Sequence, residues 1–130
     1  MKFKICIVQS IYNNDVTDKI SERAISILKE KGTKINQIFV PGAFEIPVAI
    51  SRVIKRYDGF IASGCIIKGK TPNFDFISSS ITNAIINLSI LHKKPIGNAI
   101  LTCLDREQAK ERIKKGDEAA QAVLEVLKIK

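Results

Sequence analysis

The sequence VPGAFEIP at residues 40–47 and the sequence GCIIKGKTPNFD at residues 64–75 decide the fold of this chain. Each segment begins in an apolar run typical of a buried strand, passes through a turn that contains Gly and Pro, and opens a helix-forming run. Strand–turn–helix units of this kind build a parallel α/β sheet. Ligands bind such sheets beyond the ends of the strands, so the two turns and the helix N-termini after them are candidates for holding a small anion.

Alternating strand and helix patterns cover the rest of the chain on both sides of these two segments. Short apolar runs predict strands at residues 3–8, 35–40, 58–67 and 96–104. Longer runs with helical spacing of their apolar residues predict helices at residues 17–31, 45–56, 75–93, 105–115 and 117–129. This order predicts an α/β fold with one parallel sheet, helices on both of its faces, and right-handed connections.

Turn and cap signals mark the ends of several helices. The turn at residues 13–15 can cap the first helix. Asp105 and Gln108 have the spacing of a capping box, with Asp in the place of Ser or Thr. Gly116 is expected to break or bend the helix that runs from this capping box to about Lys115.

The composition predicts one globular domain over residues 1–130. Hydrophobic residues make up 45% of the chain and charged residues 26%, which is enough to build a core. The uninterrupted apolar stretches are far shorter than the ~20 residues that span a bilayer. The N-terminus lacks the pattern of a secretory signal. We therefore expect a cytoplasmic protein without a membrane partner.

The cysteines and the single histidine argue against metal or disulfide chemistry. Cys6, Cys65 and Cys103 each lie in a predicted strand and form no CxxC pair, so we expect buried, reduced thiols. His92 falls at a helix end, where we do not expect a catalytic base.

The net charge of +8 comes mostly from scattered lysines without interleaved aromatic residues. This pattern is typical of a solvated basic face that attracts anionic substrates, and it does not favour a nucleic-acid site.

Loops at the predicted carboxyl edge of the sheet contain candidate binding residues. Lys70 and Thr71 precede a helix N-terminus that could hold an anion, although a plain strand-to-helix turn is the alternative. Phe44 could stack on a ring and Glu45 could accept hydrogen bonds, or Phe44 could be core and Glu45 only a helix-start carboxylate. Tyr12 could stack on a ligand or be half-buried.

The chain resembles the lumazine synthase family from Ile5 to about Leu127. VPGAFEIP is the most specific segment, residues 69–75 are the second, and residues 102–112 are the third. The resemblance implies a flavodoxin-like three-layer sandwich with a four-stranded parallel sheet flanked by helices. It also implies a reaction of riboflavin biosynthesis: 5-amino-6-(D-ribitylamino)uracil condenses with 3,4-dihydroxy-2-butanone 4-phosphate to 6,7-dimethyl-8-ribityllumazine, phosphate and water. The family needs no metal or organic cofactor, and forms pentamers, or sixty-subunit capsids, with active sites between subunits.

The resemblance implies a first set of residues that bind the pyrimidine substrate. Tyr12 takes the place of an aromatic residue that stacks on the ring. The segment Ala43, Phe44 and Glu45 would hold the ring and the ribityl chain. Backbone contacts to the pyrimidine would come from successive strand residues, Cys65, Ile66 and Ile67.

A second set would bind the phosphate of the four-carbon substrate. Lys70 and Thr71 match the phosphate-binding loop. Arg112 matches an arginine supplied by the adjacent subunit, and Lys115 and Glu118 match a further lysine and acid.

The chain departs from the family pattern in several places. Asn73 occupies the position of the proton-transferring histidine, and asparagine cannot titrate. Asn98 occupies the position of a phenylalanine that packs against the neighbour's ligand. Several residues of a Gly/Lys turn are missing after Arg112, and the N-terminal segment is short.

We expect a slowed but working enzyme. General acid–base assistance contributes about 10²–10⁴ in rate, whereas holding two reactants together contributes roughly 7–11 kcal/mol. One alternative is a weak or inactive family member that binds a flavin- or lumazine-like ligand. Another is an unrelated flavodoxin-like module for phosphate or nucleotides. The family resemblance also predicts that an apolar stripe on the helix at residues 75–93 is buried between subunits.

Overall fold

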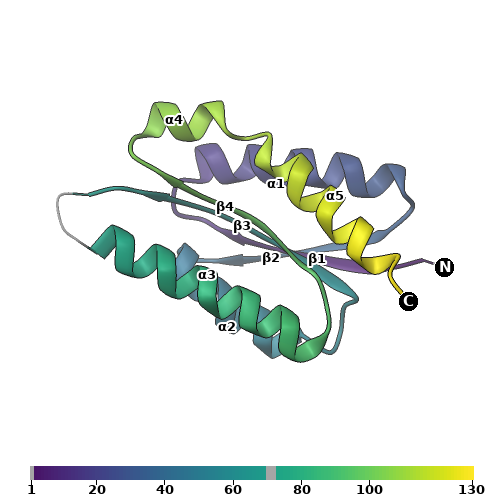
Figure 1. Cartoon of the computed structure of the whole chain (residues 1–130). Coiled ribbons are helices and arrows are strands. Elements are labelled where there is room, and N and C mark those ends of the chain that lie inside the picture. The colour runs from purple at the N-terminus through teal and green to yellow at the C-terminus, as the bar shows by residue number, and fades with distance from the viewer. Residues whose placement is uncertain (1, 70–72) are drawn as a thin grey trace.

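A four-stranded parallel sheet forms the centre of the computed structural model, which describes residues 2–69 and 73–130 (Figure 1). Its strands are β1 (Lys4–Ser10), β2 (Lys34–Val40), β3 (Gly59–Ile67) and β4 (Ile96–Cys103). Their order across the sheet is β2-β1-β3-β4, and every neighbouring pair is parallel. The predicted α/β sandwich is therefore confirmed. Lys70 and Thr71 lie outside the described residues.

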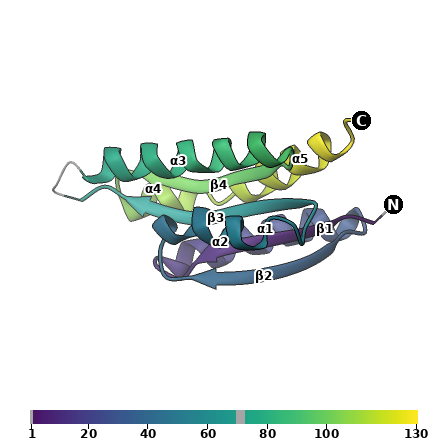
Figure 2. The same cartoon turned by 90° about the horizontal axis from the view of Figure 1, so that it is seen from below.

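Helices cover both faces of the sheet (Figures 1 and 2). The helices are α1 (Asn14–Glu30), α2 (Ile46–Val53), α3 (Asn73–His92), α4 (Arg106–Glu111) and α5 (Lys115–Leu127), and a short 3₁₀ turn, η1 (Ala43–Glu45), precedes α2. The pair α1 and α5 packs on one face, and the pair α2 and α3 packs on the other.

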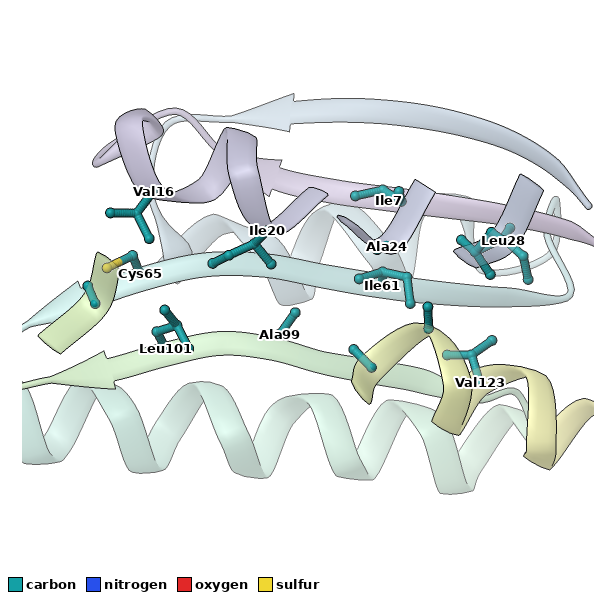
Figure 3. Close-up of a cluster of buried hydrophobic side chains, with 14 of the residues drawn as sticks. Ile7, Val16, Ile20, Ala24, Leu28, Ile61, Cys65, Ala99, Leu101 and Val123 are labelled. Atoms are coloured by element: carbon teal, nitrogen blue, oxygen red, sulfur yellow. The ribbon is translucent and has the colours of Figure 1, made fainter. Parts of the chain in front are cut away.

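The side chains of β1 alternate between two cores, as a strand covered on both faces requires. Ile5 and Ile7 pack in the core under α1 and α5, whereas Cys6 and Val8 pack in the core under α2 and α3. Figure 3 shows the first core, in which side chains of α1 and α5 meet those of the central strands. This burial makes the sheet a rigid base for the loops at its carboxyl edge.

Several helix ends differ from the prediction. Helix α1 begins at Asn14 rather than residue 17, because the carbonyl of Asn13 already accepts hydrogen bonds from the backbone N–H groups of Val16 and Thr17. Helix α3 begins at Asn73, two residues earlier than predicted, and α2 ends at Val53, three residues earlier.

The predicted break at Gly116 is wrong. The chain leaves the helix at residues 112–114, and Gly116 is the second residue of α5. A Cβ atom on Gly116 would lie 2.2 Å from the carbonyl oxygen of Ile20 in α1. The glycine is needed for the close approach of two helices, which no local pattern reveals.

One half of the predicted capping box is present at the start of α4. The backbone N–H of Gln108 donates to Oδ1 of Asp105 at 2.8 Å. In return, Oε1 of Gln108 accepts from the backbone N–H of Leu104 at 2.8 Å, one residue before the position that a capping box normally uses. The cap holds the loop after β4 in place.

Helix α3 exposes an unusual amount of apolar surface. Ile81 and Ile85 are buried against the sheet, while Phe76, Ile86 and Ile90 are exposed. By length and composition alone, α3 could cross a membrane, which differs from the prediction because the apolar residues of α3 are interrupted by polar ones. A single such helix is weak evidence for a membrane span, because a helix packed in protein passes the same test.

The three cysteines are buried and free, as predicted. Burial raises the pKa of the Cys6 and Cys65 thiols from 9.0 to about 11, and also raises the pKa of Cys103. We expect the folded protein to resist a thiol reagent at about pH 8, and all three thiols to react after denaturation. Rapid labelling of the folded protein would contradict this expectation.

Since the folded pKa values of Cys6 and Cys65 exceed the unfolded ones, their contribution to stability is complete below pH 9.0 and is lost as the pH rises toward about 11. Urea midpoints across this pH range, compared with those of a Cys6→Ala variant, measure the loss of stability. Equal pH dependence of the midpoints in the parent and in Cys6→Ala would contradict a contribution from Cys6.

Candidate functional site

The site begins at the point where the strand order reverses. From β1 the chain moves to β2 on one side, and from β3 it moves to β4 on the other, which leaves a crevice beyond the carboxyl ends of β1 and β3. A cavity of about 460 Å³ lies there, and we call it the switch-point cavity. Its lining residues are Tyr12, Asn13, Gly42, Ala43, Phe44, Cys65, Ile66, Ile67, Ile77 and Arg106.

The loop after β1 presents Tyr12 at the mouth of this cavity. The backbone N–H of Ile11 donates to the carbonyl of Val40 at 2.8 Å, and the N–H of Tyr12 donates to the carbonyl of Pro41 at 2.9 Å. The loop is thus held against the turn after β2 while the Tyr12 side chain stays 74% exposed. The half-buried alternative for Tyr12 is wrong, and an exposed ring beside a cavity is available for stacking.

The turn after β2 forms the second wall. Ala43 is buried, but Phe44 is 65% exposed, so the interpretation of Phe44 as a core residue is wrong. Oε1 of Glu45 accepts from the backbone N–H of Gly42 at 2.8 Å, and the Glu45 carboxylate therefore stabilises the start of the helical turn. Glu45 lines a neighbouring apolar hollow of about 350 Å³ rather than the switch-point cavity, while Phe44 borders both. A role for Glu45 in binding the ribityl chain stays a prediction.

The end of β3 forms the floor. The ladder between β1 and β3 ends at the pair Gln9–Ser63, whereas β3 continues to Ile67. The backbone edge of residues 64–67 that faces away from β4 is therefore not covered by β1. One group on it is used, because the carbonyl of Cys65 accepts from Nδ2 of Asn13 at 3.0 Å. This geometry suits the predicted backbone contacts between β3 and a planar polar ring.

Asn73 lies beside the cavity without lining it. It is the exposed first residue of α3, one turn before Ile77, which is a lining residue. Residues four apart in a helix share a face, so Asn73 lies on the side of α3 that borders the cavity.

The remaining predicted residues gather in a different place. Asn98, Arg112 and Lys115 line a cavity of about 430 Å³, which we call the β4-edge cavity, because β4 is an edge strand of the sheet. Glu118 lines it as well, and no lining residue is shared with the switch-point cavity. Within residues 2–69 and 73–130, neither Arg112 nor Lys115 takes part in an ion pair. Their charges are thus free to meet an anion.

The model of the 6,7-dimethyl-8-ribityllumazine synthase family matches residues 2–130. The chain belongs to this family. It is 37% identical to the 6,7-dimethyl-8-ribityllumazine synthase 1 of Rhodopseudomonas palustris, an alignment that covers 98% of the chain and 85% of the relative. It is 36% identical to the enzyme of the same name from Agrobacterium fabrum, with coverage of 97% and 93%, and 36% identical to that from Bartonella bacilliformis, with 97% and 89%.

Two features of this lumazine synthase family member limit the chemistry of the switch-point cavity. The Cys65 thiol, with its pKa raised to about 11 by burial, is protonated at neutral pH and does not act as a base. Over the part of the chain that the structure describes, no three His, Cys, Asp or Glu side chains are grouped to hold a metal ion. The described side chains of the cavity can bind and orient a ligand.

Four lining residues of the switch-point cavity are not among the predicted site residues: Asn13, Gly42, Ile77 and Arg106. The sequence pattern places Asn13 only in a turn. The structure shows that its backbone is left-handed, with φ of 61°, a conformation that asparagine adopts more readily than most residues. Arg106 had no signal at all, because its partners Asn13 and Asp15 lie 93 and 91 residues away in the chain.

Proposed function

We propose that this chain is a 6,7-dimethyl-8-ribityllumazine synthase that condenses 5-amino-6-(D-ribitylamino)uracil with 3,4-dihydroxy-2-butanone 4-phosphate in cytoplasmic riboflavin biosynthesis. The observation that carries the proposal is the division of the matched residues between two cavities. Each cavity has the chemistry for one part of the reacting pair.

The switch-point cavity suits the pyrimidine substrate. Tyr12 and Phe44 offer exposed aromatic faces, and the uncovered backbone of β3 offers hydrogen-bonding groups in a plane. A flat heterocycle with carbonyl and N–H groups can use both at once.

The β4-edge cavity suits the phosphate. Arg112, Lys114 and Lys115 lie around it, and a guanidinium binds phosphate with two parallel hydrogen bonds. Because the two cavities are separate in one chain, a complete site needs the β4 edge of one subunit next to the switch-point cavity of another. The lining therefore supports a homo-oligomer with sites between subunits.

We propose that the assembly is a pentamer or a multiple of one. The exposed apolar side chains of α3, Phe76, Ile86 and Ile90, support this proposal, because large exposed apolar patches mark interaction sites. Light scattering tests it, and a mass of one chain over the micromolar range would overturn it.

The reaction can proceed with the groups described. The 5-amino group of the pyrimidine attacks the butanone carbonyl, and a first water leaves as the C=N bond forms. Loss of the proton on carbon 3 expels phosphate with the electrons of its C–O bond, and the resulting enol becomes a ketone. The ribitylamino nitrogen attacks that ketone, and a second water leaves as the ring closes. Asn73 can hold a water or a substrate oxygen by hydrogen bonds but cannot exchange a proton with it. Proton transfer then falls to water or to the substrate phosphate, so orientation supplies most of the acceleration.

A direct assay tests the function. The purified protein is mixed with both substrates, and lumazine absorbance is followed against the uncatalysed background. Acceleration supports the synthase. Tight riboflavin binding without acceleration would instead support a second candidate function, in which this family member retains a flavin- or lumazine-like ligand. The observation that favours this candidate is Asn73, which cannot titrate.

Replacing Asn73 with histidine is expected to raise kcat by about tenfold or more, toward the 10²–10⁴ that general acid–base catalysis supplies. The pH profile of Asn73→His should differ from that of the parent around pH ~6.5, because the new histidine adds a titrating group at this position. Asn36→His, which places a histidine on the exposed side of β2, is the control and should leave the profile unchanged. Equal rates for Asn73→His and the parent at every pH would show that this position does not limit the reaction.

A further inference from the structure

Asn13 performs an unusual task for a residue at a helix start. It occupies the N-cap position of α1, but its side chain makes no cap hydrogen bond to that helix. Instead, Nδ2 donates to the carbonyl of Cys65 at 3.0 Å, and Oδ1 accepts from Nη2 of Arg106 at 2.8 Å. The Asn13 side chain therefore ties the loop after β1 to the end of β3 and to the start of α4.

Arg106 completes this connection. It is the first residue of α4, and its Nη1 donates to both carboxylate oxygens of Asp15 at 2.7 Å. One guanidinium thus holds the residue at the N-cap of α1 and a residue of its first turn. The planar guanidinium has several N–H donors, so it can hydrogen-bond both residues at once. A lysine ammonium cannot reproduce this geometry.

Global stability does not explain the arrangement. The side chains of Arg106 and Asp15 are 46% and 48% exposed, and exposed ion pairs contribute about 0–1 kcal/mol. The location is more informative, because Arg106 and Asn13 line the switch-point cavity together with Tyr12. Tyr12 is the neighbour of Asn13 in the chain and is exposed, so its position depends on how firmly the loop is held.

We propose that Arg106 is a positioning residue for the pyrimidine substrate. Acting through Asn13 and Asp15, it holds the loop at residues 11–13 so that the Tyr12 ring stays at the mouth of the switch-point cavity. The inference rests on the proposed function only for the identity of the ring that Tyr12 meets. The hold on the loop is a property of the protein without any ligand.

The first test therefore uses no ligand. Hydrogen exchange of the backbone amides of Ile11 and Tyr12, which donate to Val40 and Pro41, reports how often the loop opens. We expect Arg106→Gln to speed their exchange by about tenfold or more. The matched control is Arg23→Gln, which removes an ion pair of similar geometry between α1 and α5, with Arg23 donating to Asp117 at 2.9 Å. Arg23→Gln should leave the exchange of these two amides unchanged.

The second test measures binding and turnover. Arg106→Gln should weaken binding of riboflavin, used as an uncharged ribityl-bearing probe, by about tenfold, and should raise KM for the pyrimidine by a similar factor with little change in kcat. Arg106→Lys should partly restore riboflavin binding and KM, because lysine keeps a positive charge near Asp15 but lacks the planar guanidinium. Thermal unfolding of Arg106→Gln should resemble that of the parent.

The outcomes separate the two proposals. Unchanged exchange in Arg106→Gln would overturn the positioning role whether or not the protein is a synthase. Faster exchange with unaltered riboflavin binding and unaltered KM would overturn it as well. If the parent protein does not accelerate lumazine formation, the proposed function fails, while exchange and riboflavin binding still decide the role of Arg106.

Discussion

Replacing Arg112 with glutamine is expected to lower kcat/KM for the butanone phosphate by about 10²–10³, the largest loss of activity that we predict. The guanidinium lies at the β4-edge cavity without an ion-pair partner among the described residues, so its interaction with a phosphate is not offset by a lost internal contact. The KM for the pyrimidine should change little, because Arg112 is not part of the switch-point cavity. Steady-state kinetics with each substrate varied in turn measure both effects.

Lys110→Gln is the matched control, since Lys110 is an exposed cation of α4, two residues before Arg112 in the chain, and lines neither cavity. Co-expression provides a sharper test of where Arg112 acts. Arg112→Gln and Phe44→Ala subunits, each impaired alone, should regain about a quarter of the parent activity when mixed in one assembly, because some sites then combine two intact halves. Failure of the mixture to regain activity would argue against a site between subunits.

Replacing Gly116 with alanine is expected to cause the largest loss of stability, about 3 kcal/mol, which corresponds to a fall of roughly 10 °C in Tm. The added Cβ would lie 2.2 Å from the carbonyl oxygen of Ile20, a backbone atom that can move only if α1 and α5 separate. Alanine favours a helix over glycine by about 1 kcal/mol, so the net sign of the change shows which effect prevails. Thermal unfolding at one protein concentration measures the shift.

Gly69→Ala is the control for this substitution. A Cβ at Gly69 meets no atom within 4 Å among the described residues, so its effect should stay within about 0.5 kcal/mol. An increase in Tm for Gly116→Ala would mean that α5 can shift away from α1 without loss of packing.

The arrangement of strands and helices was predictable because its signals are local. The strand at residues 59–67 is apolar almost throughout, and the capping box of Asp105 and Gln108 spans four residues, so each pattern is complete within one segment. The carboxyl-edge location of the site followed as well, because the connection order of parallel strands determines which loops meet. The predicted helix ends were less accurate where the backbone conformation of a single residue determines the end. Asn13 determines the start of α1 in this way.

Local patterns along the chain were sufficient to predict the fold class, the family and the types of residue that a site could use. Which of these residues meet depends on the folded chain, which places Tyr12 and Phe44 at one cavity and Arg112 at another. It also brought Arg106 to Asn13 and gave Gly116 its close contact with Ile20. The physical reason is the same in each case: these contacts join residues far apart in the chain, and they depend on the packing of whole helices against the sheet. No local propensity encodes that packing.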